Sequence, residues 1–443
     1  MIVAIIGLLG GSGAYLVIGG GLTTSQAPKL LSGTGTATTG ATTSASTNVT
    51  TTGTEAAGFY LLGNSSSAHS LDGNEARKVF QAQGLTWVFY SNGTDLVYQT
   101  ISNSSTSSLT VVGPETLGWY FSVWYDQPSD TVYYASTNAS NFVATGTNQT
   151  SGNCQTVTGY GGSTVNTAST TDSAASTTYT SVTTVGCLVS GFSYGWGTPT
   201  ASGTVDWNAS GFVQTGSYAV SPYIYGNGSN VWVSLQTNGG ASIEVWLFNG
   251  SSWNRVDEIS TPFGSMNEIL PLQSGVALIY ATGGEFTYPR FSGMSITVTT
   301  NEGKTWSTPV TADDLTGWQN ALSLGDTAYF VGVDNSSQVV FWSYTYGASA
   351  FSPVQVLASG YTWPFISTNG SSLVVSYADN SSAYIRSSVD LGASWGPQSL
   401  VATPSGGIVH PVVLPFYFTN STVPACWLTG SGPYQVECAI ADT

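Results

Sequence analysis

Two nine-residue segments of this chain are near copies of one another and lie 89 residues apart. VTTNEGKTW ends at Trp306 and SSVDLGASW ends at Trp395, while SYTYGASAF, which ends at Phe351, repeats the pattern more loosely between them. The spacing of the three segments gives a repeat of about 45 residues. A repeat of this length, with several short alternating strands and no helical periodicity, is typical of the blades of a β-propeller.

Each repeat divides into four short segments, as in PFISTNG, LVVSYAD, YIRSSVD and WGPQSLVA. The same division predicts a first blade at about 77–113, a second that opens at 121–127, a third at 216–261, three more up to about 403, and a partial unit from residue 410. We therefore predict an all-β, seven-bladed propeller of four-stranded antiparallel blades. The last unit shows only three strands, so AGFYLLG near residue 60 is expected to supply the fourth and to close the ring. A Thr/Ser-rich insertion at about 139–188 interrupts the second blade, which leaves a six-bladed ring as the alternative.

The N-terminus differs in composition from the rest of the chain. Residues 1–22 are apolar and uncharged, and a helix of this length spans a bilayer. Two interpretations stay open, an uncleaved membrane anchor and the core of an export signal, with a buried hydrophobic element as a third. The first two predict an extracellular or cell-surface protein that meets the membrane through this segment. The Ser/Thr/Gly-rich residues 23–54 predict a disordered stalk, which leaves 55–443 for the propeller.

The chain is acidic and poor in charge, with 7 Lys+Arg against 23 Asp+Glu and a net charge of −16. So few cations cannot neutralise phosphates, which excludes nucleic acid as a partner. Because only 7% of the residues are charged, another group must solvate the surface, and Asn-x-Ser/Thr sequons offer glycans for this in an exported chain. Eight of the thirteen sequons fall in predicted turns. The sequon residues are Asn48, Asn64, Asn92, Asn103, Asn138, Asn148, Asn208, Asn227, Asn249, Asn335, Asn369, Asn380 and Asn420.

The four cysteines also favour an oxidising compartment. Cys426 and Cys438 flank two alternating runs around a Gly/Pro turn, so we expect them to face each other across a hairpin and to form a disulfide. Cys154 and Cys187 would then pair by elimination and close a Ser/Thr/Gly-rich loop.

Neither a metal nor a cofactor is expected. The alternative use of the cysteines, a metal site, lacks a Cys-x-x-Cys pair, and only His69 and His410 are available to assist. Motifs for a serine nucleophile, a zinc protease or a phosphate loop are also missing from the sequence.

The repeated segment resembles the Asp-box, or BNR repeat, of sialidase-like β-propellers. An Asp or Asn there caps backbone amides in a tight turn, Gly takes a positive φ, and Trp packs into the apolar layer of the blade. The resemblance implies a structural role for the box, on the face away from the pocket. We therefore predict that its Asp builds a turn and is not an acid catalyst. The matching residues are Ser388, Asp390, Gly392 and Trp395, and in the second copy Thr299, Asn301, Gly303 and Trp306.

The same resemblance implies that sialidase activity is absent. Sialidases of this class bind the substrate carboxylate with three arginines and use an Asp acid/base and a Tyr/Glu nucleophile pair. This chain has four arginines, lacks the Tyr/Phe-Arg-Ile-Pro motif, and places two of the four where they cannot reach a central pocket. The arginines are Arg77, Arg255, Arg290 and Arg386.

Another hydrolytic centre would need two carboxylates on either side of the scissile bond. The acids expected in loops of the pocket face are equally well explained as solvated loop residues. They are Glu115, Glu268, Glu285, Asp313, Asp314 and Asp334.

Aromatic residues are more frequent than paired acids in these loops. Aromatic rings with a few polar groups suit sugar binding, although rings at these positions also suit packing between blades or closure of the central channel. The ligand-binding candidates are Trp119, Trp318, Tyr361, Trp363, Arg77 and His410.

From the sequence we predict a glycosylated, non-catalytic, extracellular propeller that acts as a binding or structural protein. Its predicted partners are glycans or cell-surface proteins. Two alternatives stay open. One is a glycoside hydrolase with a non-sialidase centre, and the other is a subunit of a surface filament or lattice that assembles through residues 1–30.

Overall fold

The computed structural model describes residues 59–71, 76–102, 105–114, 121–137, 142–144, 154–162, 179–188, 191–215, 219–237, 242–261, 266–282, 292–316, 318–334, 336–419 and 421–443. The predicted N-terminal apolar segment and stalk lie outside these residues. Within the described ranges, no helix has the length and hydropathy that a bilayer span requires.

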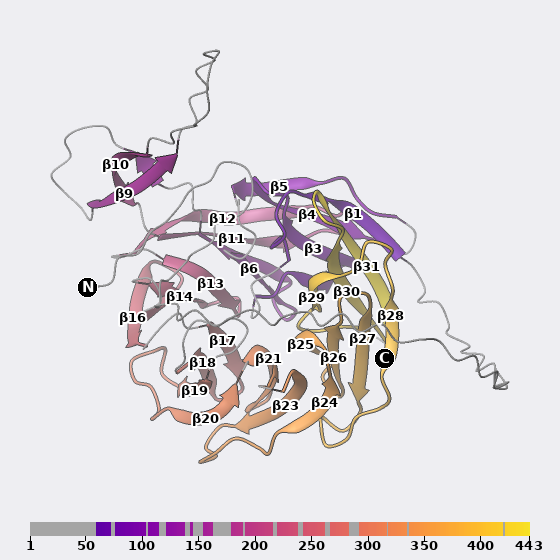
Figure 1. Ribbon diagram of the computed structural model, residues 1–443. Coiled ribbons are helices and arrows are strands. Elements are labelled where there is room, and N and C mark those ends of the chain that lie inside the picture. The colour runs from indigo at the N-terminus through magenta and orange to yellow at the C-terminus, as the bar shows by residue number, and fades with distance from the viewer. Residues whose placement is uncertain are drawn as a thin grey trace, which may run out of the picture. The chain divides into compact units, whose positions relative to one another are not determined.

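Seven sheets of four antiparallel strands form a propeller, and the first strands of successive blades contact one another around its axis (Figure 1). Blade 1 contains β2 (Val79–Ala82), β3 (Leu85–Ser91), β4 (Asp95–Ile101) and β5 (Thr110–Pro114). Blade 2 contains β6 (Phe121–Asp126), β7 (Thr131–Ser136), β11 (Gly191–Pro199) and β12 (Val205–Gln214). Blade 3 contains β13 (Ala219–Gly226), β14 (Val231–Thr237), β15 (Ser242–Phe248) and β16 (Trp253–Ser260).

Blade 4 contains β17 (Asn267–Leu272), β18 (Gly275–Ala281), β19 (Ser292–Thr299) and β20 (Val310–Thr316). Blade 5 contains β21 (Trp318–Leu324), β22 (Thr327–Val333), β23 (Gln338–Thr345) and β24 (Gln355–Ser359). Blade 6 contains β25 (Thr362–Thr368), β26 (Leu373–Ala378), β27 (Ala383–Ser388) and β28 (Ser399–Ala402). Blade 7 contains β29 (Val409–Val413), β30 (Thr422–Thr429), β31 (Tyr434–Asp442) and β1 (Phe59–Ser65). The predicted seven-bladed fold is confirmed, and the six-bladed alternative is wrong.

Burial follows the position of each strand within its blade. The second strands are buried almost throughout, as β26 is at every residue, because both of their faces pack against other blades. The outermost strand β16 alternates between exposed and half-buried residues. Fully buried side chains such as Leu278 and Val375 each stabilise the fold by about 1.5–3 kcal/mol. The apolar layers between blades therefore hold the ring together.

Blade 7 joins the two ends of the propeller chain. β1 pairs with β31, with Phe59 opposite Ala439 and Tyr60 opposite Cys438. This is the closure predicted for the segment near residue 60. Cys438 also forms the predicted disulfide with Cys426 on the neighbouring strand β30. The disulfide therefore cross-links the C-terminal hairpin to which β1 pairs.

A separate three-stranded sheet is formed by β8 (Phe142–Ala144), β9 (Cys154–Gly162) and β10 (Tyr179–Leu188), in the order β8-β10-β9. In the sequence it falls between β7 and β11, which pair directly in blade 2. The backbone register of this sheet places Cys154 directly opposite Cys187. The side chains of both cysteines lie outside the described part, so their pairing stays a prediction.

The two box segments form the turns between the third and fourth strands of their blades, β27 to β28 and β19 to β20, with the same hydrogen bonds. In blade 6 the Gly392 amide donates to Ser388 Oγ at 2.7 Å, and the Ser394 amide donates to Asp390 Oδ1 at 2.8 Å. In blade 4 the corresponding residues Thr299 and Asn301 accept hydrogen bonds of 2.9 Å each from their own turn. The hydrogen bonds of the Asp390 carboxylate therefore go to residues of its own turn, as expected for a turn-building residue.

The hydrogen bonds from Ser394, first through its hydroxyl and then through its amide, lower the pKa of Asp390 to about 2, from an ordinary value of 3.8. Because the pKa is lower in the folded state, the ionised carboxylate of Asp390 stabilises the fold fully at pH values above 3.8, the ordinary pKa of the group. This contribution is lost as the pH falls from there through about 2, the pKa in the folded protein.

Each box turn also docks its blade onto the preceding one. Trp395 lies edge-on to Phe341 of blade 5, with ring centroids 5.1 Å apart, and Gln355 donates to the Gly392 carbonyl at 2.9 Å. Gly392 has a φ of 92°, and a Cβ there would lie 2.4 Å from the Phe341 ring. The glycine is therefore required both by the turn and by the neighbouring blade.

We expect Gly392→Ala to destabilise the propeller by on the order of 3 kcal/mol, of which roughly 1–2 kcal/mol comes from the positive φ and the rest from overpacking. Gly370→Ala is the matched control, because Gly370 has a φ of 91° and open space where a Cβ would be placed. Urea unfolding of both variants measures the difference. Equal losses in the two variants would show that the contact with Phe341 does not constrain the turn.

Candidate functional site

Arg77 is a buried cation that contacts several blades. It lies two residues before β2 and is 2% exposed. Its guanidinium donates to the Ile366 carbonyl of blade 6 at 2.6 Å and to the Ala321 carbonyl of blade 5. It also lies 5.2 Å from the centre of the Phe416 ring in blade 7. One buried cation thus links blade 1 to three other blades.

A tyrosine and a glutamate form a hydrogen-bonded pair near Arg77. The Tyr223 hydroxyl of β13 donates to Glu268 Oε1 of β17 at 2.7 Å, and both side chains are buried. Burial raises the pKa of Tyr223 well above its ordinary value, and the Glu268 charge raises it further, while Arg77 acts in the opposite direction. The phenol therefore keeps its proton. A nucleophilic tyrosine would need the opposite shift.

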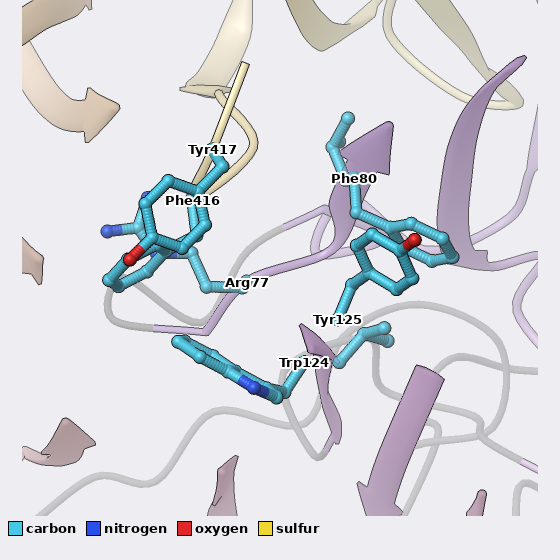
Figure 2. A pocket seen from close by; sticks show the side chains of 8 residues that line it. Arg77, Phe80, Trp124, Tyr125, Phe416 and Tyr417 are labelled. Carbon is cyan, nitrogen blue, oxygen red and sulfur yellow. The ribbon is translucent and has the colours of Figure 1, made fainter. Parts of the chain in front are cut away.

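The space beside this group is too small for a sugar. Figure 2 shows Arg77 next to Phe416 and Tyr417, with Trp124 close to them and Phe80 stacked on Tyr125 across the gap. The cavity that these side chains line has a volume of about 10 Å³, which is room for about one water molecule. The group contains the residue types of a Tyr/Glu nucleophile pair with one arginine, but the cavity beside it has no room for a sugar ring.

The expectation that Glu268 lies in a solvated loop is wrong, because Glu268 is a fully buried residue of β17. Asp334 caps its own turn by accepting from the Ser336 and Gln338 amides, each at 2.8 Å. The other predicted loop acids, Glu115, Glu285, Asp313 and Asp314, lie outside the described residues or have side chains that do.

Two of the predicted aromatic candidates can be placed. Tyr361 packs within blade 6, with ring centroids 5.1 Å from Tyr377 and 5.2 Å from Tyr384, and its hydroxyl accepts from Gln398 at 3.1 Å. Trp363 is half-buried in a bulge of β25 and has a φ of 56°. Trp119 lies outside the described residues, as do the side chains of Trp318 and His410.

A larger pocket opens between blades 2 and 3, where the sequence pointed to no site. Its volume is about 270 Å³. The aromatic part of its wall is Tyr133 of β7, Trp196 of β11 and Phe248 of β15. The remaining lining residues are Thr131, Asn208, Gly228, Ser229, Val231 and Gly250.

Trp196 is held in place by the rings around it. Its ring stacks on Tyr194 with centroids 5.3 Å apart and an interplanar angle of 19°, and it lies 5.1 Å from Phe248. The Tyr133 hydroxyl accepts from the Gly228 amide at 3.0 Å. Trp196 and Phe248 are both half-buried. The pocket therefore presents fixed aromatic surface to solvent, and polar groups stand at its rim.

A sequence signal for this pocket exists in the segment GFSYGWGTP, which becomes β11. Glycines alternate there with aromatic residues, and a Cβ at Gly195 would lie 2.4 Å from the Tyr134 ring. The glycines thus leave room for rings from the neighbouring strand. A β-bulge between Trp196 and Gly197 then shifts the register with β12, which redirects side chains locally.

Comparison with known proteins supports the fold. A polysaccharide lyase of family PL25, an ulvan lyase, has a TM-score of 0.51 at 8% identity, covering 85% of this chain and 94% of the lyase. The same lyase bound to -[GlcA(1-4)Rha3S]- gives a TM-score of 0.50 at 8% identity, with the same coverage. A mutant of the NanB sialidase from Streptococcus pneumoniae gives 0.42 at 10% identity, covering 77% of this chain and 68% of the sialidase. No protein-family model and no curated protein matches the chain.

Proposed function

We propose that this protein is a non-catalytic, extracellular carbohydrate-binding propeller whose site is the aromatic pocket between blades 2 and 3. The observation that carries the proposal is a half-buried Trp196, packed between other rings, in the wall of a pocket of about 270 Å³. Ligand sites in proteins have volumes of about 300–1,000 Å³, so this pocket suits one or two sugar units. The two box turns are proposed to be Asp-boxes with a purely structural role.

The chemistry of the pocket fits a pyranose better than a charged ligand. The apolar face of a sugar ring stacks on an aromatic ring, and its hydroxyls bond to polar groups at the rim. Here the rim offers the Asn208 amide, the Ser229 hydroxyl and the Thr131 hydroxyl. No Lys, Arg, Asp or Glu is among the described residues that line the pocket. The likeness to a polysaccharide lyase supports the fold and not the ligand.

The proposal is tested with a glycan array followed by titration of the best ligand. We expect Trp196→Ala to weaken binding at least tenfold, which corresponds to about 1.4 kcal/mol, because the stacking surface is lost. Tyr361→Ala is the control, since Tyr361 belongs to the site predicted on blade 6. Thermal unfolding of both variants establishes that they are folded. Unchanged binding by Trp196→Ala, or loss of binding by Tyr361→Ala alone, would refute this site.

A further inference from the structure

Six of the seven sequon asparagines that the structure describes fall into two groups, and the seventh, Asn380, lies in the turn between β26 and β27. Four asparagines lie in turns, and the Oδ1 atom of each accepts hydrogen bonds from backbone amides of its own turn. The shortest of these N···O distances is 2.9 Å at Asn92, 2.9 Å at Asn227, 3.3 Å at Asn249 and 2.8 Å at Asn369. Turn building alone explains why such residues are Asn. Asn64 and Asn208 lie instead in the outermost strands β1 and β12 and are exposed.

Asn208 has no comparable structural task. It sits at the bulge of β12, where Trp207 pairs with Gly197 and Ala209 pairs with Trp196, so Asn208 has no partner residue on β11. In the part of the chain that the structure describes, its side-chain amide makes no hydrogen bond. Asn208 nevertheless lines the pocket between blades 2 and 3. An asparagine of this kind is available both to a ligand and to a modifying enzyme.

The same pocket collects three sequons. Gly228 and Ser229 belong to the sequon of Asn227, and Gly250 belongs to that of Asn249; all three residues line the pocket. Of the three acceptor asparagines, Asn208 is the one that itself lines the pocket. A sugar attached to Asn208 Nδ2 would be bonded to a residue of the pocket wall, which also contains the half-buried Trp196.

We propose that Asn208 is N-glycosylated and that the first sugar of this glycan occupies the pocket, so that the modified chain carries its own ligand. This inference rests on the proposed function, because the features that would hold a free sugar also hold the attached one. The transfer forms a bond between Asn208 Nδ2 and the anomeric carbon of the sugar. It breaks the bond from that carbon to a phosphate oxygen of a lipid-linked oligosaccharide donor, and an amide proton leaves as the lipid phosphate is released.

Glycosylation of Asn208 then decides which sugar the pocket holds. In the unmodified chain the pocket is open to external sugars. In the modified chain an attached sugar competes at a high effective concentration, because it is tethered beside its site. External binding is therefore weakened without any change in the protein fold.

The test compares full-length wild-type protein with Ser210→Ala, both produced in a host that N-glycosylates secreted proteins. Ser210→Ala destroys the sequon but keeps the Asn208 side chain in the pocket. Asn64→Gln is the matched control, because it removes an exposed strand sequon that does not line the pocket. Mass spectrometry of glycopeptides measures occupancy, and titration with the methyl β-glycosides of glucose and N-acetylglucosamine measures binding.

We expect a glycan on Asn208 of the wild type, and at least tenfold tighter binding of a methyl glycoside by Ser210→Ala than by the wild type or by Asn64→Gln. We also expect an endoglycosidase to release this glycan from the native protein more slowly than the glycans in turns. An unmodified Asn208 in a protein whose turn sequons carry glycans would overturn the inference.

The remaining outcomes separate the inference from the proposed function. If Ser210→Ala and the wild type bind the sugar equally well although Asn208 is glycosylated, the cradled glycan is refuted and the proposed function stands. If neither protein binds a sugar but the Asn208 glycan is protected from release, the proposed function is refuted and the cradled glycan stands.

Discussion

A chain that begins at residue 67 will fail to form a stable monomeric ring, whereas a chain that begins at residue 58 will form one. The shorter chain lacks β1, which pairs six residues with β31 and buries Leu62. Each lost backbone hydrogen bond removes about 0.5–1.5 kcal/mol and the lost leucine about 1.5–3 kcal/mol. The total loss, on the order of 5 kcal/mol, approaches the whole net stability of a typical domain.

Size-exclusion chromatography with light scattering and thermal unfolding measure this difference. The unpaired edge of β31 favours association with other chains, so the shorter chain should run as aggregates. A synthetic peptide of residues 58–66 should restore the monomer, and a scrambled peptide should not. A shorter chain that stays monomeric and unfolds at the temperature of the longer one would contradict the closure by β1.

The second large effect is expected from Arg77→Ala, with a loss of about 3–5 kcal/mol. Removing one member of a buried charged group leaves its partners without compensation. Here the Ile366 and Ala321 carbonyls lose their donor, and the buried Glu268 loses a neighbouring cation.

Lys304→Ala is the control, because it removes the same charge from a side chain that is 75% exposed, where an ion pair contributes little. Arg77→Lys keeps the charge but not the two-armed geometry, so an intermediate loss is expected. Denaturant unfolding at constant pH measures all three variants. If Arg77→Ala lost no more stability than Lys304→Ala, the channel would not depend on this residue.

The fold was predictable because the signals of a propeller blade are local. The alternating strands, the Gly-containing turns and the box that ends at Trp395 all lie within one repeat, and each shapes a hairpin of its own blade. The closure by β1 is also predictable from the number of strands in each unit, because the last unit of the sequence contains only three. The disulfide between Cys426 and Cys438 was predictable for the same reason, because both residues belong to one hairpin.

The sites were less predictable because they arise between blades. Arg77, Tyr223 and Glu268 come from blades 1, 3 and 4, and no motif joins them, so the sequence alone predicts a loop acid at Glu268. The pocket at Trp196 depends on a bulge and on the gap between blades 2 and 3, neither of which the repeat encodes. In the sequence, Asn208 is equivalent to the other sequon asparagines. It differs from them in the structure, because it lies at a bulge of β12 and lines the pocket.

The pairing of Phe59 with Ala439 also sets the order of biogenesis. β1, the first propeller strand to be synthesised, cannot pair until β31, its partner, has been made. Contacts between residues so distant in sequence form slowly. In a chain that crosses a membrane during synthesis, blade 7 would therefore stay open, and the chain could pass through the translocation channel, until the C-terminus has emerged. Chaperones and thiol oxidases on the far side would meet an open ring, and closure of blade 7 would mark the completion of transit.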